Sequence, residues 1–178
     1  MHKFSAHKLL AALTELTVEA RSAFAQACAI RTLTSCSERR PLAEPVQNLC
    51  VRALAVAETS TASTARAGEL KLLCEQFDAL RELDDDRVAA CAFVVRHLHG
   101  GGNPQEAVWA AQRAYESQDQ LAQDAMVFQS YTADVKAKLL AFPAVQAELL
   151  AQLNDIEDLT ARPSDLRPIV LRAKANRT

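Results

Sequence analysis

The spacing of apolar residues is the feature that most constrains the fold of this chain. They recur every three or four positions along the sequence, as on one face of an α-helix. The strict alternation that marks a half-buried β-strand is missing. Alanine and leucine dominate, and both favour helix over strand. Aromatic residues make up only 5% of the chain, and there are 4 glycines. The pattern therefore predicts an all-α fold.

Length and composition predict a single domain. The chain has 178 residues, 49% of them hydrophobic, which is enough for one core of ordinary size. We predict a single-domain multi-helix bundle of about seven or eight helices spanning residues 1–178. One stretch, residues 58–66, is rich in Ser, Thr and Ala and has no apolar period. It predicts a mobile loop within the domain.

The predicted helices follow one another along the whole chain, with prolines marking starts and turns. The apolar pattern of the last long helix, 143–159, predicts that Val145, Leu149, Leu153 and Ile156 face the core. A short basic helix is expected after it. The other expected ranges are 5–16, 18–34, 45–57, 67–80, 84–99, 103–125 and 132–140.

The stretch "DDDRVAACAFVVRHLHGGGNPQE", residues 84–106, holds the most unusual residues of the chain. Aspartates at 84–86 suit the positive end of a helix dipole and can cap its N-terminus. The glycines at 100–102 can adopt the positive φ that ends a helix. Asn103, followed by Pro104 and Glu106, predicts a capping box at the next helix. Each feature therefore starts or stops a helix, and no chemistry is required.

The histidines and acidic residues do not form a known metal-binding pattern. His97 and His99 are two positions apart, so on a helix they point in nearly opposite directions. A helical zinc pair needs a spacing of four. No Glu precedes a His by three, as a di-iron bundle requires. The aspartates at 84–86 are not followed by the ligands of an EF-hand. We therefore predict no metal site and no cofactor.

Sequence motifs of enzymes are also missing. The chain contains neither the GxSxG nucleophile motif nor the glycine-rich phosphate loop GxxxxGK[ST]. "HGGGN" has the look of an esterase oxyanion loop, but without a nucleophile motif or strands it is interpreted as a turn that ends a helix. We predict no catalytic residues.

The cysteines and the apolar segments favour a cytoplasmic protein. The five cysteines form no CxxC pair and lie among Ala, Leu and Val, as small buried residues do. A disulfide framework is therefore not expected. The N-terminal apolar run is short and broken by Glu15, so no signal peptide is predicted. No apolar stretch is long enough for a membrane span, and no membrane partner is expected.

Charge along the chain suggests a protein partner. The net charge is −2 and the isoelectric point about 6.1, which argues against nucleic acid as a partner. Residues 69–87 carry seven acids against three bases. They form either a solvated helix face or an acidic docking surface. Trp109 and Tyr115 have amphipathic side chains that suit either an interface or the margin of a core. The candidate partner-binding residues are Glu75, Asp78, Glu82, Asp84, Asp85, Asp86, Trp109 and Tyr115.

Three segments resemble a bacterial family of unknown function, the YjaG-like proteins. They are "AFAQACAIRTL" (23–33), "AACAFVVRHLHGGGNPQEAVWAAQRAYES" (89–117) and "FPAVQAELLAQLNDIEDL" (142–159). The first is similar to an early helix of that family, the second to its central helix pair and the third to its late helix that starts at a proline. The resemblance implies an all-α fold in a cytoplasmic bacterial protein. It implies no activity and no catalytic residues.

Three functions are compatible with this sequence. The first is a non-enzymatic protein-binding domain, such as an immunity or antitoxin-like protein that neutralises a bacterial toxin through an acidic surface. The second is a structural or regulatory protein that forms homo-oligomers through an apolar helix face. The third, an enzyme or ligand-binding bundle, has the least support in the sequence.

Overall fold

The computed structural model describes residues 1–35, 41–58, 64–80, 84–128 and 130–175. These residues form nine helices and no strand, which confirms the all-α prediction. The number is slightly above the seven or eight predicted, and it includes the short basic helix expected near the C-terminus. The helices are α1 (Ala6–Thr14), α2 (Val18–Ser35), α3 (Glu44–Glu58), α4 (Thr64–Asp78), α5 (Asp86–His99), α6 (Pro104–Ala125), α7 (Ala133–Leu140), α8 (Pro143–Ala161) and α9 (Arg167–Ala175).

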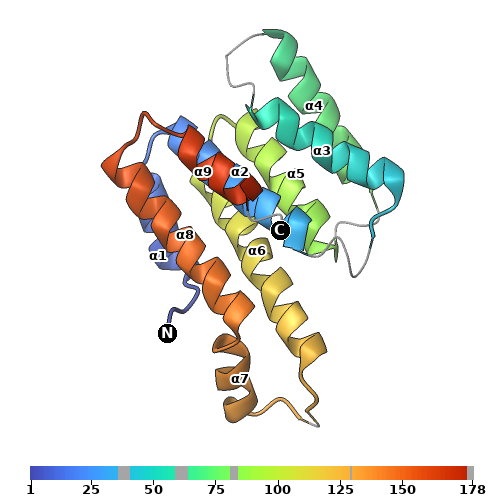
Figure 1. Cartoon of the computed structure of the whole chain (residues 1–178). Helices are drawn as coiled ribbons and strands as arrows, with labels where there is room; N and C mark the ends of the chain where they lie inside the picture. Colours follow the sequence, from blue (N-terminus) through green and yellow to red (C-terminus); the bar gives the residue numbers. More distant parts are fainter. Residues whose placement is uncertain (36–40, 59–63, 81–83, 129, 176–178) are drawn as a thin grey trace.

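Helices α2, α5 and α6 form the centre of the bundle, and each packs against the other two. Helices α3 and α4 cover α5 on one side, and α9 lies across α2 (Figure 1). On the other side α1 and α8 pack against α6, while α7 joins the far ends of α6 and α8. Segments far apart in sequence are thus brought together around α2.

Small side chains allow the central helices to approach one another closely. Most buried positions of α2, α5 and α6 carry Ala, Cys or Val, with few large side chains between them. Packing of this kind is dense and leaves little room for cavities. Residues buried in this main core include Ala20, Phe24, Ala27, Cys28, Val88, Cys91, Val95, Ala107, Ala111 and Ala114.

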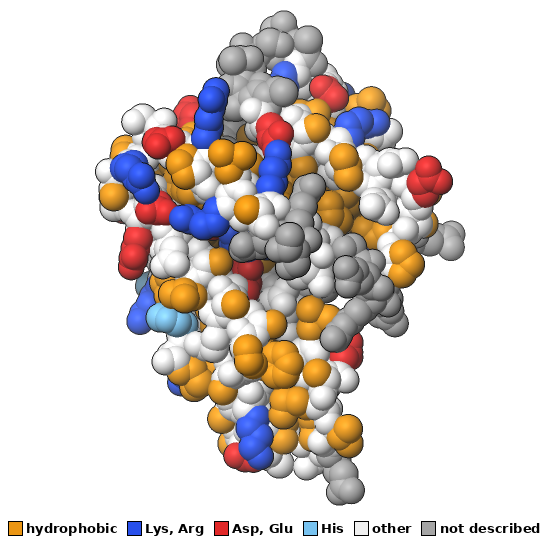
Figure 2. All heavy atoms as spheres, viewed as in Figure 1, with side chains coloured by type: hydrophobic (Ala, Val, Ile, Leu, Met, Phe, Trp, Pro, Cys, Tyr) orange, Lys and Arg blue, Asp and Glu red, His pale blue; other side chains and the backbone are white. Residues whose placement is uncertain are grey.

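A second, smaller core lies where α6, α7 and α8 meet. It is built from Ala122, Leu139, Val145 and Leu149. Phe4 reaches it from the N-terminal segment and stacks on Tyr115, with ring centroids 5.3 Å apart. On the face shown in Figure 2, hydrophobic side chains also gather over this end of the molecule, and most of the charged side chains in view lie toward the opposite end. The second core therefore holds an arm that extends from the main bundle.

Several helix starts follow the predicted capping chemistry. The side chain of Asp85 accepts a hydrogen bond from the backbone of Arg87, and Asn103 does the same for Gln105. Only half of the predicted capping box at α6 forms: within the described residues, the buried Oε2 of Glu106 has no hydrogen-bond partner.

Of the four α8 residues predicted to face the core, Val145 and Leu149 are buried and Ile156 is partly buried against it, as expected, but the inward face is rotated so that Leu153 is left outside. Leu153, which we expected in the core, is 44% exposed, whereas Glu148, Gln152 and Asp155 are buried. The prediction for Leu153 was therefore wrong. The reason is electrostatic: the polar side chains of α8 turn inward to meet an arginine of α2, and this outweighs the burial of one more leucine.

Helices extend into both ends of the region predicted as a mobile loop, 58–66. Helix α3 continues to Glu58 and α4 begins at Thr64, while residues 59–63 lie outside the described residues. None of the helices in the described part of the chain combines the length and apolar character needed to cross a bilayer.

The turn between α5 and α6 depends on its glycines. Gly101 and Gly102 have φ values of 72° and 87°, and the Gly102 amide donates to the His97 carbonyl at 2.8 Å. This is the hydrogen bond of a Schellman motif, which closes the C-terminus of a helix. A Cβ atom at Gly102 would lie 2.4 Å from Cγ1 of Val18. The turn can therefore press against the start of α2 only because residue 102 has no side chain.

We predict that Gly102→Ala lowers the free energy of unfolding by about 2–4 kcal/mol, because it combines an unfavourable φ with a clash against Val18. Urea denaturation followed by circular dichroism measures the effect. Gly68→Ala in α4 is the matched control. It has no atom within 4 Å of the new Cβ and should stabilise the protein by roughly 0.5–1 kcal/mol. Equal effects of the two substitutions would contradict this account.

Candidate functional site

The most strongly organised polar cluster of the described residues surrounds Arg31 in the middle of the bundle. Nε and Nη2 of Arg31 donate to the two carboxylate oxygens of Glu148 at 2.9 and 3.2 Å. Nη1 donates to Oδ2 of Asp155 at 2.7 Å. Paired hydrogen bonds of this geometry are the strongest that a guanidinium forms with carboxylates. They join α2 to two points on α8 that lie seven residues, or about two turns, apart.

Two further side chains complete the cluster. Gln152 donates from Nε2 to the Ala111 carbonyl of α6 at 3.0 Å and to Oε1 of Glu148 at 2.9 Å. Arg172 of α9 donates to the second oxygen of Asp155 at 2.7 Å. One connected network thus ties α2, α6, α8 and α9 together.

The Arg31 cluster is closed to solvent. The side chains of Arg31 and Asp155 are only 9% and 1% exposed. Burial lowers the pKa of Arg31, but Glu148, Cys28 and Asp155 more than offset this and hold it above its usual range. The guanidinium is therefore always charged. Since Arg31, Glu148 and Asp155 are themselves buried, we interpret their ion pairs as a structural connection between helices.

The cysteine beside Arg31 is not an activated nucleophile. Its Sγ atom lies 3.4 Å from Nη2 of Arg31, but burial raises the pKa of Cys28 well above its usual value. A protonated thiol is a poor nucleophile. Cys28, Cys50, Cys74 and Cys91 are free thiols, and Cys36 lies outside the described residues.

His97 connects the α5–α6 turn to α2. The buried ring has Nδ1 at 2.8 Å from the Asn103 carbonyl and Nε2 at 3.1 Å from the Ser22 hydroxyl. Because a carbonyl only accepts, Nδ1 is the donor. Burial lowers the pKa of His97, although hydrogen bonds to the Asn103 and Val18 backbone oppose this, so the neutral ring is favoured. Within the described residues, no group of three or more His, Cys, Asp or Glu side chains could hold a metal ion.

Several predicted partner-binding aspartates form ion pairs within the chain. Asp78 pairs with Arg96 at 2.5 Å, and Asp86 with Arg113 at 3.1 Å. Asp85 pairs with the buried Arg87 at 2.7 Å. This surface is therefore less acidic than the sequence indicates, because arginines from α5 and α6 compensate these aspartates.

Three of the predicted partner-binding residues, Trp109, Asp78 and Asp86, belong to one groove between α5 and α6 or to the ion pairs beside it. Trp109 is 39% exposed and lies against Phe93, with ring centroids 5.4 Å apart. The groove measures ≈ 300 Å³ and is lined by Phe93, Trp109, Gln112 and Arg113. The Arg96 guanidinium lies 5.6 Å from the centre of the Phe93 ring, within the range of a cation–π contact. Asp86 pairs with Arg113, which lines the groove, and Asp78 pairs with Arg96, which contacts the Phe93 ring.

The other predicted partner-binding residues do not line this groove. Tyr115 belongs to the second core, where it is half-buried against Phe4. Glu75 is exposed, 3.9 Å from the Lys71 amine. Asp84 is exposed, with no ion pair to another described residue. Glu82 lies outside the described residues.

The sequence prediction missed Phe93 and Arg113, which line the groove, and Arg96, which contacts the Phe93 ring. One signal was present: Phe93 and Arg96 are three positions apart and therefore lie on the same side of α5. The contribution of Arg113 depends on how α6 packs against α5, and helical spacing within one segment does not contain that information.

No protein-family model, curated protein or solved structure matches this chain. Membership of the YjaG-like family stays a prediction from the three resembling segments.

The burial of His97 predicts a pH dependence of stability. Because the folded-state pKa is depressed, the unfolded chain binds the proton first as pH falls below about 6.5, and stability is lost on that side. We expect the free energy of unfolding to fall more between about pH 7.5 and pH 5 in the native protein than in His97→Asn, which cannot titrate. Urea denaturation at each pH measures this difference. Parallel pH profiles would show that His97 makes no such contribution.

Proposed function

We propose that this protein is a non-enzymatic protein-binding domain, of the immunity or antitoxin-like type, and that it docks its partner on the groove between α5 and α6. The observation that carries the proposal is the exposed Trp109, which lies against the partly buried Phe93 in a groove lined by Arg113, with Arg96 in contact with the Phe93 ring. Tryptophan and arginine are the residues most enriched at the energetic centres of protein interfaces.

The pairing of charges around the groove also supports a docking role. Arg96 and Arg113 are each held by an aspartate of this chain, so their side chains are partly ordered before a partner arrives. Ordering in advance lowers the entropy lost on binding. The exposed Asp84, near the start of α5, adds negative charge that would attract a basic partner and raise the association rate.

Three further points belong to this proposal. The YjaG-like resemblance implies a bacterial source. A cytoplasmic location would keep the free thiols reduced. Homo-oligomerisation is the alternative, and it would use the same aromatic pair as a contact between copies.

The partner can be identified and the groove tested together. A photo-crosslinking residue, p-benzoylphenylalanine, placed at position 109 should capture one protein in cells of the source organism, whereas the same residue at position 72 should not. With the purified partner, Trp109→Ala should weaken binding about 30-fold or more, which is ~2 kcal/mol. Isothermal titration calorimetry measures the affinity.

Leu72→Ala is the matched control, because Leu72 is an exposed apolar residue on α4, outside the groove. It should bind the partner as the native protein does. Crosslinks of the position-109 variant to a second copy of the chain would favour the homo-oligomer. An unchanged affinity of Trp109→Ala for the captured partner would contradict the proposed docking surface.

A further inference from the structure

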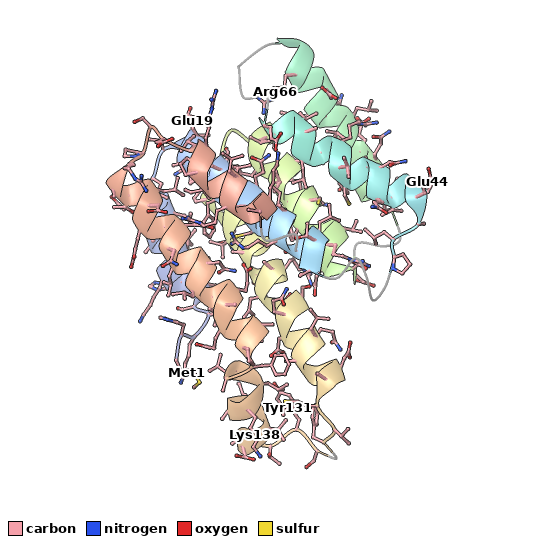
Figure 3. All side chains as sticks on the ribbon, in the orientation of Figure 1. Met1, Glu19, Glu44, Arg66, Tyr131 and Lys138 are labelled. Atoms are coloured by element: carbon pink, nitrogen blue, oxygen red, sulfur yellow. The ribbon has the colours of Figure 1, made fainter. Side chains whose placement is uncertain are left out.

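A second groove lies between α8 and the N-terminal segment that leads into α1. Its volume is ≈ 150 Å³, and its apolar lining includes Phe4, Leu9, Leu149, Leu153 and Ile156. Figure 3 shows the N-terminal residue, Met1, close to α8. The groove shares no lining residue with the one between α5 and α6, so it does not depend on the function proposed above.

The groove is formed before any ligand binds. The backbone amide of His2 donates to Oε1 of Gln146 at 2.8 Å, and Nε2 of Gln146 donates to the His2 carbonyl at 3.0 Å. This pair of hydrogen bonds fixes the N-terminal segment against α8. The stacking of Phe4 on Tyr115 holds the segment against α6 as well. A pre-formed site binds with less loss of entropy than one that must be ordered.

The charged residues around the groove are all basic. Lys3 and Lys8 line it, and no Asp or Glu is found among its described lining residues. This local charge is opposite in sign to the net charge of the chain, −2. A ligand with negative charge next to an apolar group is therefore favoured.

One buried polar side chain also borders the groove. Gln152 is only 5% exposed, and both hydrogens of its amide group are used, one by Ala111 and one by Glu148. Its Oε1 atom accepts no hydrogen bond from the described residues. This oxygen is therefore available to accept one from a donor such as a peptide N–H.

The size of the groove favours the side chain of a partner over a free small molecule. A cavity of this volume holds about one aromatic ring, whereas sites for small molecules usually measure roughly 300–1,000 Å³. The apolar surface continues outside it, because Leu153 is partly exposed and Leu150, one turn away on α8, is 46% exposed. A single anchor side chain with further contacts around it is typical of peptide recognition.

We propose that the groove between α8 and the N-terminal segment docks an acidic peptide segment of a partner protein, which inserts one bulky apolar side chain. The anchor lies among Leu9, Leu149 and Leu153. Carboxylates that flank it meet Lys3 and Lys8. The backbone of the segment donates a hydrogen bond to Gln152.

Fluorescence polarisation with a short labelled peptide tests the proposal, the probe being one phenylalanine set between glutamates. We expect it to bind the native protein, and to bind about tenfold more weakly when its phenylalanine is replaced by alanine. Leu153→Glu should weaken binding by about tenfold or more. The double variant Lys3→Glu, Lys8→Glu should weaken binding of the acidic peptide and improve binding of a peptide with lysines in place of the glutamates.

Leu72→Glu and Lys136→Glu are the matched controls, because each changes an exposed residue of the same type outside the groove. Both should bind the acidic peptide as the native protein does. The proposal is overturned if the peptide does not bind at concentrations up to about 1 mM, or if the controls lose as much affinity as the groove variants. It is also overturned if octanoate, but no peptide, occupies the groove, or if sedimentation shows a second copy of the chain there.

Discussion

The rest of this structure depends on the pairing of one buried arginine with two carboxylates. Arg31 is charged and buried near the C-terminal end of α2, so the bundle can close around it only where opposite charges meet it. Glu148 and Asp155 provide them from one side of α8, and this sets the rotation of that helix. Arg172 extends the same network to α9. Once α8 is fixed in this way, Leu150 and Leu153 face outward and form part of the surface.

The helices themselves could be predicted from local sequence. Caps at Ser5, Asp85, Asn103 and Thr132, and the glycines that end α5, act within one or two turns of the chain. The rotation of α8 could not be predicted from its apolar spacing, which favoured Leu153 over Gln152. A signal did exist in two places. Arg31 is the only charged residue between Arg21 and Glu38, and three polar residues of α8 share one stripe at positions 148, 152 and 155.

The candidate docking surfaces were predictable only in part, since both form between helices. The sequence identified Trp109, Asp78 and Asp86 as candidates. Their contacts are made with residues of neighbouring helices: Trp109 with Phe93, and the two aspartates with Arg96 and Arg113. The groove beside α8 exists because Glu148, Gln152 and Asp155 turn inward while Leu150 and Leu153 stay at the surface. Both grooves therefore follow from tertiary contacts, and the second depends directly on the network around Arg31.

The free energy of unfolding of Arg31→Met tests this account most directly. Removing the guanidinium leaves the buried Glu148 without its charged partner and leaves Asp155 paired with Arg172 alone, and we predict a loss of about 3–5 kcal/mol. Adding Glu148→Gln and Asp155→Asn to the same chain should recover a large part of it, because the uncompensated charges are then gone. Arg172→Met, a change at a side chain that is 44% exposed, should cost far less. If Arg31→Met unfolds at the same denaturant concentration as the native protein, the Arg31 network does not hold the bundle together.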